Sequence, residues 1–321
     1  MSLTEIKLEE LNTDEFIAKQ CEALSSEVGD SAAVNALSGG VDSSVVTMLA
    51  HRALGDRLKT YFIDNGIMRE GEPEHVVNII KECGAPVELI DAKDEFFDAL
   101  KGKTDPEEKR QAITDTFYKS VFSRLVKESG AKHLLQGTIY TDVEETVAGI
   151  KRQHNILAQL GIDTAKEFGY NVIEPVIELR KPAVREVGKA LGLPESIYNR
   201  PPFPGPALVA RVIGEATPER IALVRTATVI LEEELAGINN FQNMAILHED
   251  KIPGMRDGKR DYGLQIEIRC WDTKDAVTAT PTRVPFDTLE KLAARMTSEV
   301  PGVVSVTYNI ATKPPSTMEA V

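Results

Sequence analysis

The stretch Ser38-Gly39-Gly40-Val41-Asp42-Ser43-Ser44 decides how this chain is interpreted, because it joins a short apolar run to a helical pattern. Residues 32–37 are predicted to form a buried strand, and the helical pattern continues through residues 45–54. The first backbone N–H groups of a helix have no partner within the helix, and the helix dipole adds positive potential there. Paired glycines let an anion approach the backbone, and serine hydroxyls add donors. The stretch therefore predicts a phosphate site at a helix N-terminus.

The loop carries one carboxylate and no lysine, so it differs from the Walker type of phosphate loop. Such a loop suits a diphosphate whose charge is partly met by a metal ion, with Asp42 as the candidate magnesium ligand. The competing interpretation is a plain helix cap, for which one serine or aspartate is enough. The order S-G-G-x-D-S resembles the signature of the PP-loop ATP pyrophosphatases, which adenylate a carbonyl or carboxyl oxygen and release pyrophosphate. The expected ATP-binding residues of the loop are Ser38, Gly39, Gly40, Asp42, Ser43 and Ser44.

The composition is that of an acidic folded protein. Its 321 residues are 42% hydrophobic and 27% charged, with a net charge of −13. A general nucleic-acid binder would carry a basic footprint, so we expect no nucleic-acid partner. The three cysteines are far apart and include no C-x-x-C pair, which gives no support to a zinc or iron–sulfur site. With no secretory leader and no apolar run near the roughly 18 residues of a membrane span, a cytoplasmic protein that binds no membrane is expected.

Short apolar runs alternate with helical patterns between residues 32 and 193, which predicts a doubly wound parallel sheet with ligands at the carboxyl ends of its strands. The runs cover 32–37, 60–63, 87–90, 133–135 and 172–176, and the helices cover 43–54, 74–83, 106–129 and 182–191. We predict an N-terminal helix in residues 1–30, an α/β ATP-pyrophosphatase domain of the adenine nucleotide alpha hydrolase-like kind in 31–198, and a smaller α+β domain in 199–321.

Residues 199–206, N-R-P-P-F-P-G-P, mark the change between these domains. Proline fixes φ and removes N–H donors, so the segment is predicted to be rigid and non-helical. It is interpreted either as a linker or, because it carries an aromatic ring, as a wall for a planar ligand. Beyond it the pattern predicts helices over 218–235 and 286–299, and strands over 262–271 and 303–309.

Two further segments follow predicted strands at the binding edge of the sheet. Residues 61–66, Y-F-I-D-N-G, would place Ile63 beside an adenine ring, although Asn-Gly also favours a plain turn. Residues 136–146, Q-G-T-I-Y-T-D-V-E-E-T, add Gly137 to the expected ATP site, and their carboxylates suit a metal or a ribose hydroxyl. The alternative for the second segment is a solvated acidic loop.

A basic segment and the C-terminal tail complete the candidate site. Residues 150–155, I-K-R-Q-H-N, offer cations for the charge that develops on the leaving pyrophosphate, and Lys151 and His154 join Asp42 as catalytic candidates. The tail, residues 313–319, reads K-P-P-S-T-M-E and offers a cation, hydroxyls and a carboxylate to a nucleotide. The plainer interpretations are an exposed basic loop and a disordered terminus.

Taken together, these blocks resemble the ATP-pyrophosphatase part of GMP synthetases, from about residue 16 to residue 319. The blocks occur in family order: LSGGVDSSV, FIDNGIMREGE, DPEEKR, QGTIYTDVEET, GIKRQHN, PPFPGPALVARVIGE, VPFDTLEKL and KPPSTME. The resemblance implies that ATP adenylates the 2-oxygen of xanthosine monophosphate (XMP), and that ammonia then displaces AMP to give GMP. It also implies a C-terminal domain that forms a homodimer, and contacts to XMP from Arg110, Gln242, Lys313, Thr317 and Glu319.

The chain departs from the family pattern mainly on the lid and substrate side, while the ATP side is intact. The family lid usually reads K-S-H-H-N, and the family tail usually ends in an aromatic residue followed by Glu. The departures are Thr141 for proline, Arg152 and Gln153 for Ser and His in the lid, Pro202 for His, Ala207 for Gly, and Ala320-Val321 at the end.

About 30 residues precede the loop, so the resemblance is to the stand-alone synthetase subunit seen mainly in archaea. It implies that ammonia comes from a separate glutamine amidotransferase subunit or from free ammonium. Two alternatives stay open here. One is a PP-loop enzyme that adenylates a different acceptor, for example to insert sulfur, and the other is a non-catalytic nucleotide-binding paralogue.

Overall fold

The computed structural model describes residues 3–147, 170–200, 203–256, 258–274 and 277–320. The chain forms two compact units, each assembled from segments that are separate in sequence. Unit 1 contains residues 1–64, 73–91 and 117–200, and unit 2 contains 65–72, 92–116 and 201–321. Segments 65–72 and 92–116 thus pack with the C-terminal part, although the sequence analysis placed them in the ATP-pyrophosphatase domain. Both segments begin where the chain leaves the carboxyl end of a strand.

Unit 1 is built on five parallel strands in the order β3-β2-β1-β4-β5. The strands are β1 (Ala33–Ala36), β2 (Leu58–Asp64), β3 (Glu88–Asp91), β4 (His133–Leu135) and β5 (Asn171–Ile173). The strand order reverses at β1, which pairs with β2 on one side and β4 on the other. This is the doubly wound sheet that the alternation predicted. Ligands of such sheets bind beyond the carboxyl ends of the strands at the reversal.

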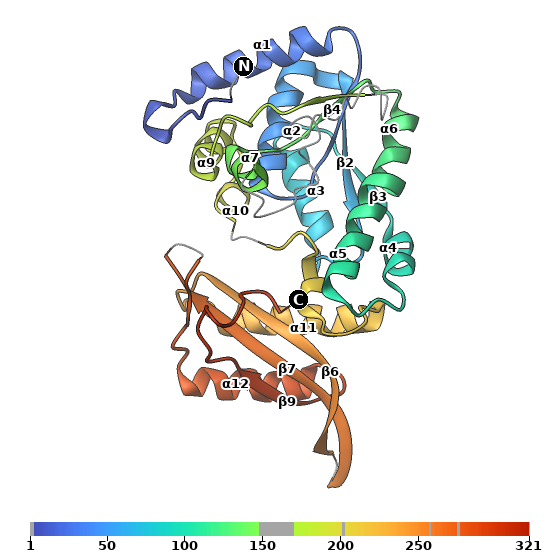
Figure 1. Cartoon of the computed structure of the whole chain (residues 1–321), viewed down its shortest axis with the longest axis vertical. Helices are drawn as coiled ribbons and strands as arrows, with labels where there is room; N and C mark the ends of the chain where they lie inside the picture. The colour runs from blue at the N-terminus through green and yellow to red at the C-terminus, as the bar shows by residue number, and fades with distance from the viewer. Residues whose placement is uncertain (1–2, 148–169, 201–202, 257, 275–276, 321) are drawn as a thin grey trace. The chain divides into compact units, whose positions relative to one another are not determined.

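Helices α1 (Thr13–Val28), α2 (Val41–Leu54) and α9 (Lys181–Ala190) pack against one another, with α6 (Ser123–Ser129) on the opposite side of the strands (Figure 1). The helix predicted in residues 1–30 is present only as α1, from Thr13 to Val28, which buries its apolar residues Phe16, Ile17 and Leu24. A buried hydrogen bond of 2.9 Å from Asn35 Nδ2 to Thr47 Oγ1 ties β1 to α2. The other helical elements among the described residues of unit 1 and its borders are η1 (Leu8–Glu10), η2 (Gly55–Arg57), α3 (Glu72–Glu82), η3 (Thr116–Phe122, a π-helix), α7 (Tyr140–Val147) and α10 (Glu195–Tyr198).

Two expectations for these helices were wrong in detail. The single helix predicted over 106–129 is interrupted by the π-helical η3. The acidic loop considered for 136–146 is instead helical from Tyr140, and Asp142 Oδ2 accepts the Ile139 N–H at 3.0 Å at its start. Carboxylates near a helix N-terminus favour helix rather than loop, because they satisfy unpaired N–H groups.

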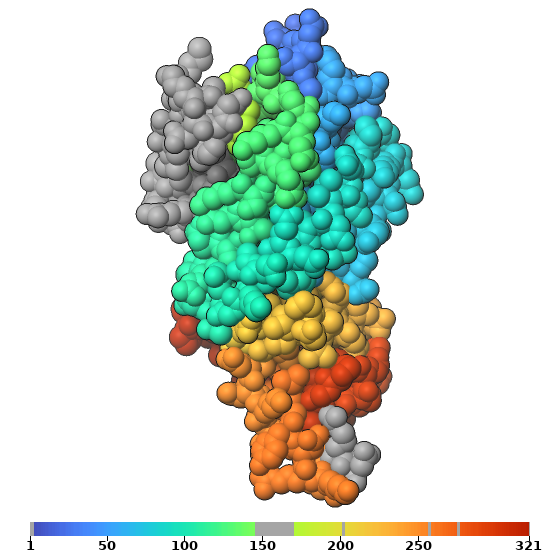
Figure 2. Space-filling model, turned by 90° about the vertical axis from the view of Figure 1, so that its right-hand side faces the viewer, coloured from blue at the N-terminus to red at the C-terminus, as the bar shows by residue number. Residues whose placement is uncertain are grey.

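Unit 2 contains a sheet in which β6 (Gln242–Arg256) and β7 (Lys259–Asp272) form an antiparallel hairpin. The short β8 (Thr280–Pro281) pairs antiparallel with β7, and β9 (Val303–Tyr308) pairs parallel with it. Helices α11 (Pro218–Glu234) and α12 (Phe286–Glu299) pack together on this sheet, and the hairpin extends beyond them (Figures 1 and 2). The unit also contains α4 (Lys93–Leu100), α5 (Pro106–Asp115) and the 3₁₀ turn η4 (Ala207–Arg211).

A buried lysine fixes α5 within unit 2. Lys109 is 1% exposed, and its Nζ donates to the carbonyl oxygens of Val212 at 2.7 Å and Gly214 at 3.0 Å. Burial, followed by the charge of Arg220, lowers the pKa of Lys109 to about 8 from its ordinary 10.5. The helix that carries Arg110 is therefore anchored at its first turns.

The lowered pKa of Lys109 gives unit 2 a pH-dependent stability that a Lys109→Met variant lacks. Between pH 8 and 10.5 the folded lysine has lost its proton while the unfolded one keeps it, so the free energy of unfolding rises with pH. We expect the difference in free energy of unfolding, wild type minus Lys109→Met, to increase from pH 8 to pH 10 in denaturant titrations. A difference that stays constant or falls over that range would contradict this.

Candidate functional site

The start of α2 is an open helix N-terminus. Gly40 occupies the N-cap position, and no side chain of the described residues caps the helix there. The capping interpretation of the serines is therefore wrong. Gly40 has no side chain, and the serine hydroxyls are used elsewhere. The first N–H groups of α2 and its dipole lie just beyond the carboxyl end of β1, where ligands of such sheets bind.

The serines instead hold the loop in shape. Ser43 Oγ donates to the Gly40 carbonyl at 3.1 Å, and Ser44 Oγ donates to the same oxygen at 2.9 Å. The hydroxyl groups of Ser38 and Ser43 are hydrogen-bonded to each other, with 3.0 Å between the two Oγ atoms. Gly39 has φ +80°, a conformation that favours glycine. Its carbonyl oxygen accepts a hydrogen bond of 3.0 Å from Arg200 Nη1. The loop is thus pre-shaped without using its helix N–H groups.

Gly137, which follows β4, approaches the same loop so closely that a side chain there would crowd its backbone. A Cβ at this position would lie 3.1 Å from the carbonyl carbon of Asp42 and 3.1 Å from the backbone nitrogen of Ser43. Sequence analysis assigned Gly137 to the ATP site. The structure shows the packing reason for glycine there: the loop after β4 lies directly on the start of α2.

Asp42 is paired with a residue that the sequence analysis missed. Lys181 Nζ, at the start of α9, forms a salt bridge with Asp42 Oδ2, and 139 residues separate the two in sequence. The other carboxylate oxygen, Oδ1, is buried and has no hydrogen-bond partner among the described residues. The loop carries no lysine of its own, but the fold supplies one from α9.

The other residues predicted for the ATP side are Ile63, Lys151 and His154. Ile63 is 2% exposed within β2 and belongs to the core of the sheet. Lys151 and His154 lie outside the described residues, as do Arg152 and Gln153 of the altered lid sequence. Among the residues that are described, no three His, Cys, Asp or Glu side chains cluster as a metal site would require.

The tail candidates come together with Gln242 in unit 2. Gln242 Nε2, at the start of β6, donates to Glu319 Oε1 at 2.8 Å, and Thr317 Oγ1 donates to the Glu319 carbonyl at 2.7 Å. Glu319 Oε2 is buried without a partner among the described residues. Burial raises the pKa of Glu319, and the charge of Arg211 opposes this shift. Lys313 is held by its backbone, which pairs with Ala279 in both directions.

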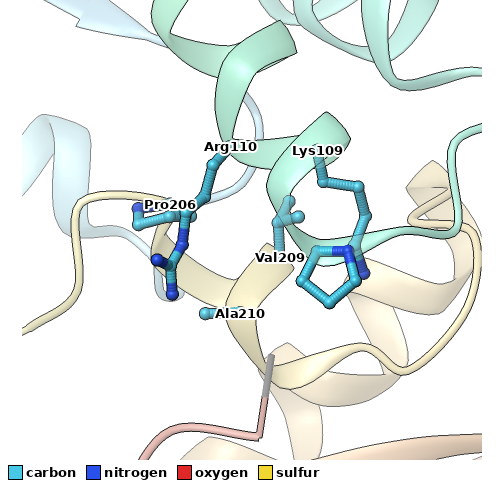
Figure 3. Close-up of a pocket in the computed structure, with 6 residues that line it drawn as sticks. Lys109, Arg110, Pro206, Val209 and Ala210 are labelled. Atoms are coloured by element: carbon cyan, nitrogen blue, oxygen red, sulfur yellow. The ribbon is translucent and has the colours of Figure 1, made fainter. Parts of the chain in front are cut away.

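Arg110 projects from α5 beside the 3₁₀ turn η4. Figure 3 shows Lys109 and Arg110 leaving the helix on different sides of Val209 and Ala210, with Arg110 beside Pro206. The Arg110 side chain is 47% exposed and reaches Glu107 Oε1 at 3.3 Å. Burial raises the pKa of Glu319, and the positive charge of Arg110 is the smallest of the effects that oppose this shift. Of the predicted XMP contacts, Gln242 and Glu319 are thus joined by a hydrogen bond, and the charge of Arg110 acts weakly on the same carboxylate.

Two arginines lie over the aromatic ring of Phe203 in the proline-rich segment. The guanidinium carbons of Arg69 and Arg211 lie 4.6 Å and 4.9 Å from the centroid of the Phe203 ring. Arg211 is 3% exposed, and its Nε has no hydrogen-bond partner among the described residues. Neither arginine was singled out from the sequence, because no local pattern connects it to Phe203. The segment is thus more than a passive linker. Whether it also forms a wall for a planar ligand stays a prediction.

Comparison with known proteins assigns both parts of the chain. A family model described as NAD synthase matches residues 16–205, and one described as the GMP synthase C terminal domain matches residues 231–320. Proteins named as the B subunit of glutamine-hydrolysing GMP synthase are similar over almost the whole chain. The relative from Archaeoglobus fulgidus is 46% identical over 96% of this chain and 99% of its own length.

Two further relatives of the same name agree with this assignment. The protein from Pyrococcus furiosus is 45% identical over 95% of this chain and 97% of its own length. The protein from Methanopyrus kandleri is 41% identical over 95% of this chain and 98% of its own length. The open helix N-terminus, the tail against Gln242 and these similarities lead to one conclusion: the chain belongs to the family of GMP synthase B subunits.

Proposed function

We propose that this chain is the synthetase component that uses ATP to convert XMP to GMP. The observation that carries the proposal is the uncapped N-terminus of α2 beside Asp42 and Lys181, in a chain similar along almost its full length to GMP synthase B subunits. The 2-oxygen of XMP attacks the α-phosphorus of ATP, and the bond from that phosphorus to pyrophosphate breaks. Ammonia then attacks C2, and the bond to the adenylated oxygen breaks to release AMP.

On the ATP side the chain's own groups bind and orient the phosphates. Residues 38–44 present helix N–H groups to the phosphate tail, and the loop keeps its shape because its serines are engaged internally. Lys181 lies next to Asp42 and offers a cation to the departing pyrophosphate, which is the role that loops of the Walker type give to their own lysine.

A magnesium ion fits this site. Asp42 Oδ1 is a buried oxygen without a partner among the described residues, and magnesium is commonly bound by one or two carboxylates together with substrate phosphates. We propose that Asp42 holds magnesium, whose bound charge would help neutralise the phosphates.

On the XMP side we propose contacts from Arg110, Gln242, Lys313, Thr317 and Glu319. The unpartnered Oε2 of Glu319 supports this assignment, because a buried acceptor without a donor is costly unless a ligand supplies one. Arg110 adds a cation to the same neighbourhood, which suits the phosphate of a nucleotide.

The sulfur-inserting alternative finds no support in the cysteines. Burial raises the pKa of all three thiols, Cys21, Cys83 and Cys270, so each is a poorer nucleophile than an ordinary cysteine. A non-catalytic paralogue would have no need of the intact loop with its paired Asp42 and Lys181.

The remaining proposals concern partners and location. Because the similar proteins are named as subunits of glutamine-hydrolysing enzymes, we propose a separate glutamine amidotransferase subunit as the source of ammonia. We also propose a homodimer formed through unit 2, a cytoplasmic location, and roles in the lid for Lys151 and His154. No helix of the described residues has the length and apolar character to cross a membrane.

The paired Asp42 and Lys181 should act on ATP and not on XMP. We expect Asp42→Asn to lower pyrophosphate release by about 100-fold or more, the order of loss seen when a preorganised charge is removed from an active site. Lys181→Met should lower kcat/KM for ATP while the KM for XMP stays within about twofold. Lys189→Met, in the same helix and exposed, is the control. Equal losses for both substrates, or unchanged turnover, would contradict these roles.

The activity itself is tested with the purified chain, ATP, magnesium, XMP and an ammonium salt. We expect GMP, AMP and pyrophosphate in equal amounts, and no GMP when glutamine replaces ammonium and the chain is the sole protein present. The decisive comparison is a set of carbonyl acceptors in place of XMP. Pyrophosphate released with another acceptor but not with XMP would overturn the proposed substrate and favour a different PP-loop activity.

A further inference from the structure

Among the described residues, the C-terminal tail forms no strand beyond Tyr308 and pairs through an isolated bridge at Lys313, yet it carries three of the proposed XMP contacts. Something else must therefore hold residues 317–319 in place, since binding by an unordered segment loses affinity to the cost of ordering it. The contacts that hold this segment come from one face of β7.

Strand β7 has two faces of opposite character. Ile266, Ile268 and Cys270 alternate on one face and are at most 1% exposed. Glu267, Arg269 and Trp271 alternate on the other face, and the two charged side chains are only 13% and 12% exposed. Charged residues on the outer face of a sheet are normally solvated, so these two are covered by other parts of the chain. The tail contacts Arg269, whereas Glu267 is contacted by His248 and Asn309.

Arg269 is the main polar contact to the tail. Its Nη1 lies 3.0 Å, 3.4 Å and 3.2 Å from the carbonyl oxygens of Thr317, Met318 and Glu319, respectively. Trp271 Nε1 adds a hydrogen bond of 3.3 Å to the Met318 carbonyl. One guanidinium thus contacts the carbonyl oxygens of three successive residues. These contacts hold the backbone of Glu319 where its side chain can accept a hydrogen bond from Gln242.

Met318 and Ala320 anchor the tail from the apolar side. Both pack against the cluster of Met244, Ile246, Trp271 and Ala279. Ala320 supplies only a methyl group to this contact.

Glu267 fixes the direction of Arg269. Its Oε1 accepts Arg269 Nε at 2.6 Å and Asn309 Nδ2 at 2.9 Å, and its Oε2 lies 2.9 Å from His248 Nε2. Hydrogen bonds from His248, Asn309 and Arg269 hold the pKa of Glu267 down at about 2, against the opposing effect of burial. The carboxylate is therefore ionised at neutral pH and orients the guanidinium through a charge-assisted bond.

We propose that Glu267 and Arg269 are positioning residues for the acceptor nucleotide: Arg269 binds the tail carbonyls, Glu267 aims Arg269, and together they hold Glu319 in place to bind XMP. The proposal rests on the proposed function, since it assigns these residues to the XMP half of that reaction. It predicts that they affect XMP binding without touching the substrate.

The test uses the conservative variants Arg269→Lys and Glu267→Gln in the full chain. A lysine keeps the charge but cannot join Glu267 and the carbonyls in the same geometry. We expect Arg269→Lys to raise the KM for XMP by about 10-fold or more, and Glu267→Gln by about 3-fold or more, each with the KM for ATP and the kcat at saturating XMP within about twofold.

The matched controls come from another ion-paired arginine of unit 2. Arg295, on α12, binds Glu299 at 2.7 Å and is not among the tail contacts, so Arg295→Lys and Glu299→Gln should leave both KM values unchanged. Hydrogen exchange of peptides covering residues 312–321 provides a readout independent of activity. Exchange there should accelerate in Arg269→Lys and Glu267→Gln, while exchange in β6 and β7 stays as in the wild type.

Three results separate the proposals. Unchanged tail exchange together with an unchanged KM for XMP in both variants would overturn the positioning role. Equal increases in the KM values for XMP and ATP would also overturn it, because they would indicate a general structural loss. If the wild type makes no GMP from XMP, the proposed function fails. In that case tail exchange alone decides whether Glu267 and Arg269 hold the tail.

Discussion

An uncapped helix end at the strand reversal is the constraint on which unit 1 depends. Helix α2 begins shortly after β1, and Gly40 leaves its first N–H groups without a side-chain cap. Burying such groups without a partner is costly, so the site is stable only if water or an anion satisfies them. The rest of the loop agrees with this requirement. Gly137 lets the segment after β4 lie on the loop, the serines brace it, and Lys181 balances the single carboxylate.

In unit 2 the main requirement is different: the C-terminal tail must be held in one position if it is to bind a nucleotide. It uses a strand with an apolar face toward the core and a charged face toward the tail. The charges of Glu267 and Arg269 satisfy each other and the tail carbonyls, so their burial does not leave an unpaired charge. At the end of these contacts lies Glu319 Oε2, a buried oxygen with no partner in the described part of the chain. That is the atom to which the proposed substrate would bind.

Local patterns predicted most of the architecture and only part of the site. The parallel strands, the phosphate loop and helices such as α11 and α12 follow from periodicity and from helix start signals near each element. Strand β6 was missed because Pro253 and Gly254 argue against an interior strand, and the edge of the sheet tolerates both. Lys181 and Arg269 could not be assigned, since their partners lie 139 and about 50 residues away and no local rule connects them.

Ala207 shows how a departure from the family pattern is accommodated. It has φ +50°, in the left-handed region that glycine adopts readily, and alanine there costs about 1 kcal/mol. The chain thus adopts a left-handed conformation at a position where the resemblance leads us to expect glycine. The departures at Arg152 and Gln153 concern the lid sequence, which the described residues do not include.

The central claim is that ATP activates XMP before ammonia enters. It is tested most directly by exchange of labelled pyrophosphate into ATP, measured with magnesium and without ammonium. The account predicts exchange that requires XMP, proceeds without any nitrogen source, and is lost in Asp42→Asn. Exchange that proceeds equally well without XMP, or GMP formation with no exchange at all, would contradict it.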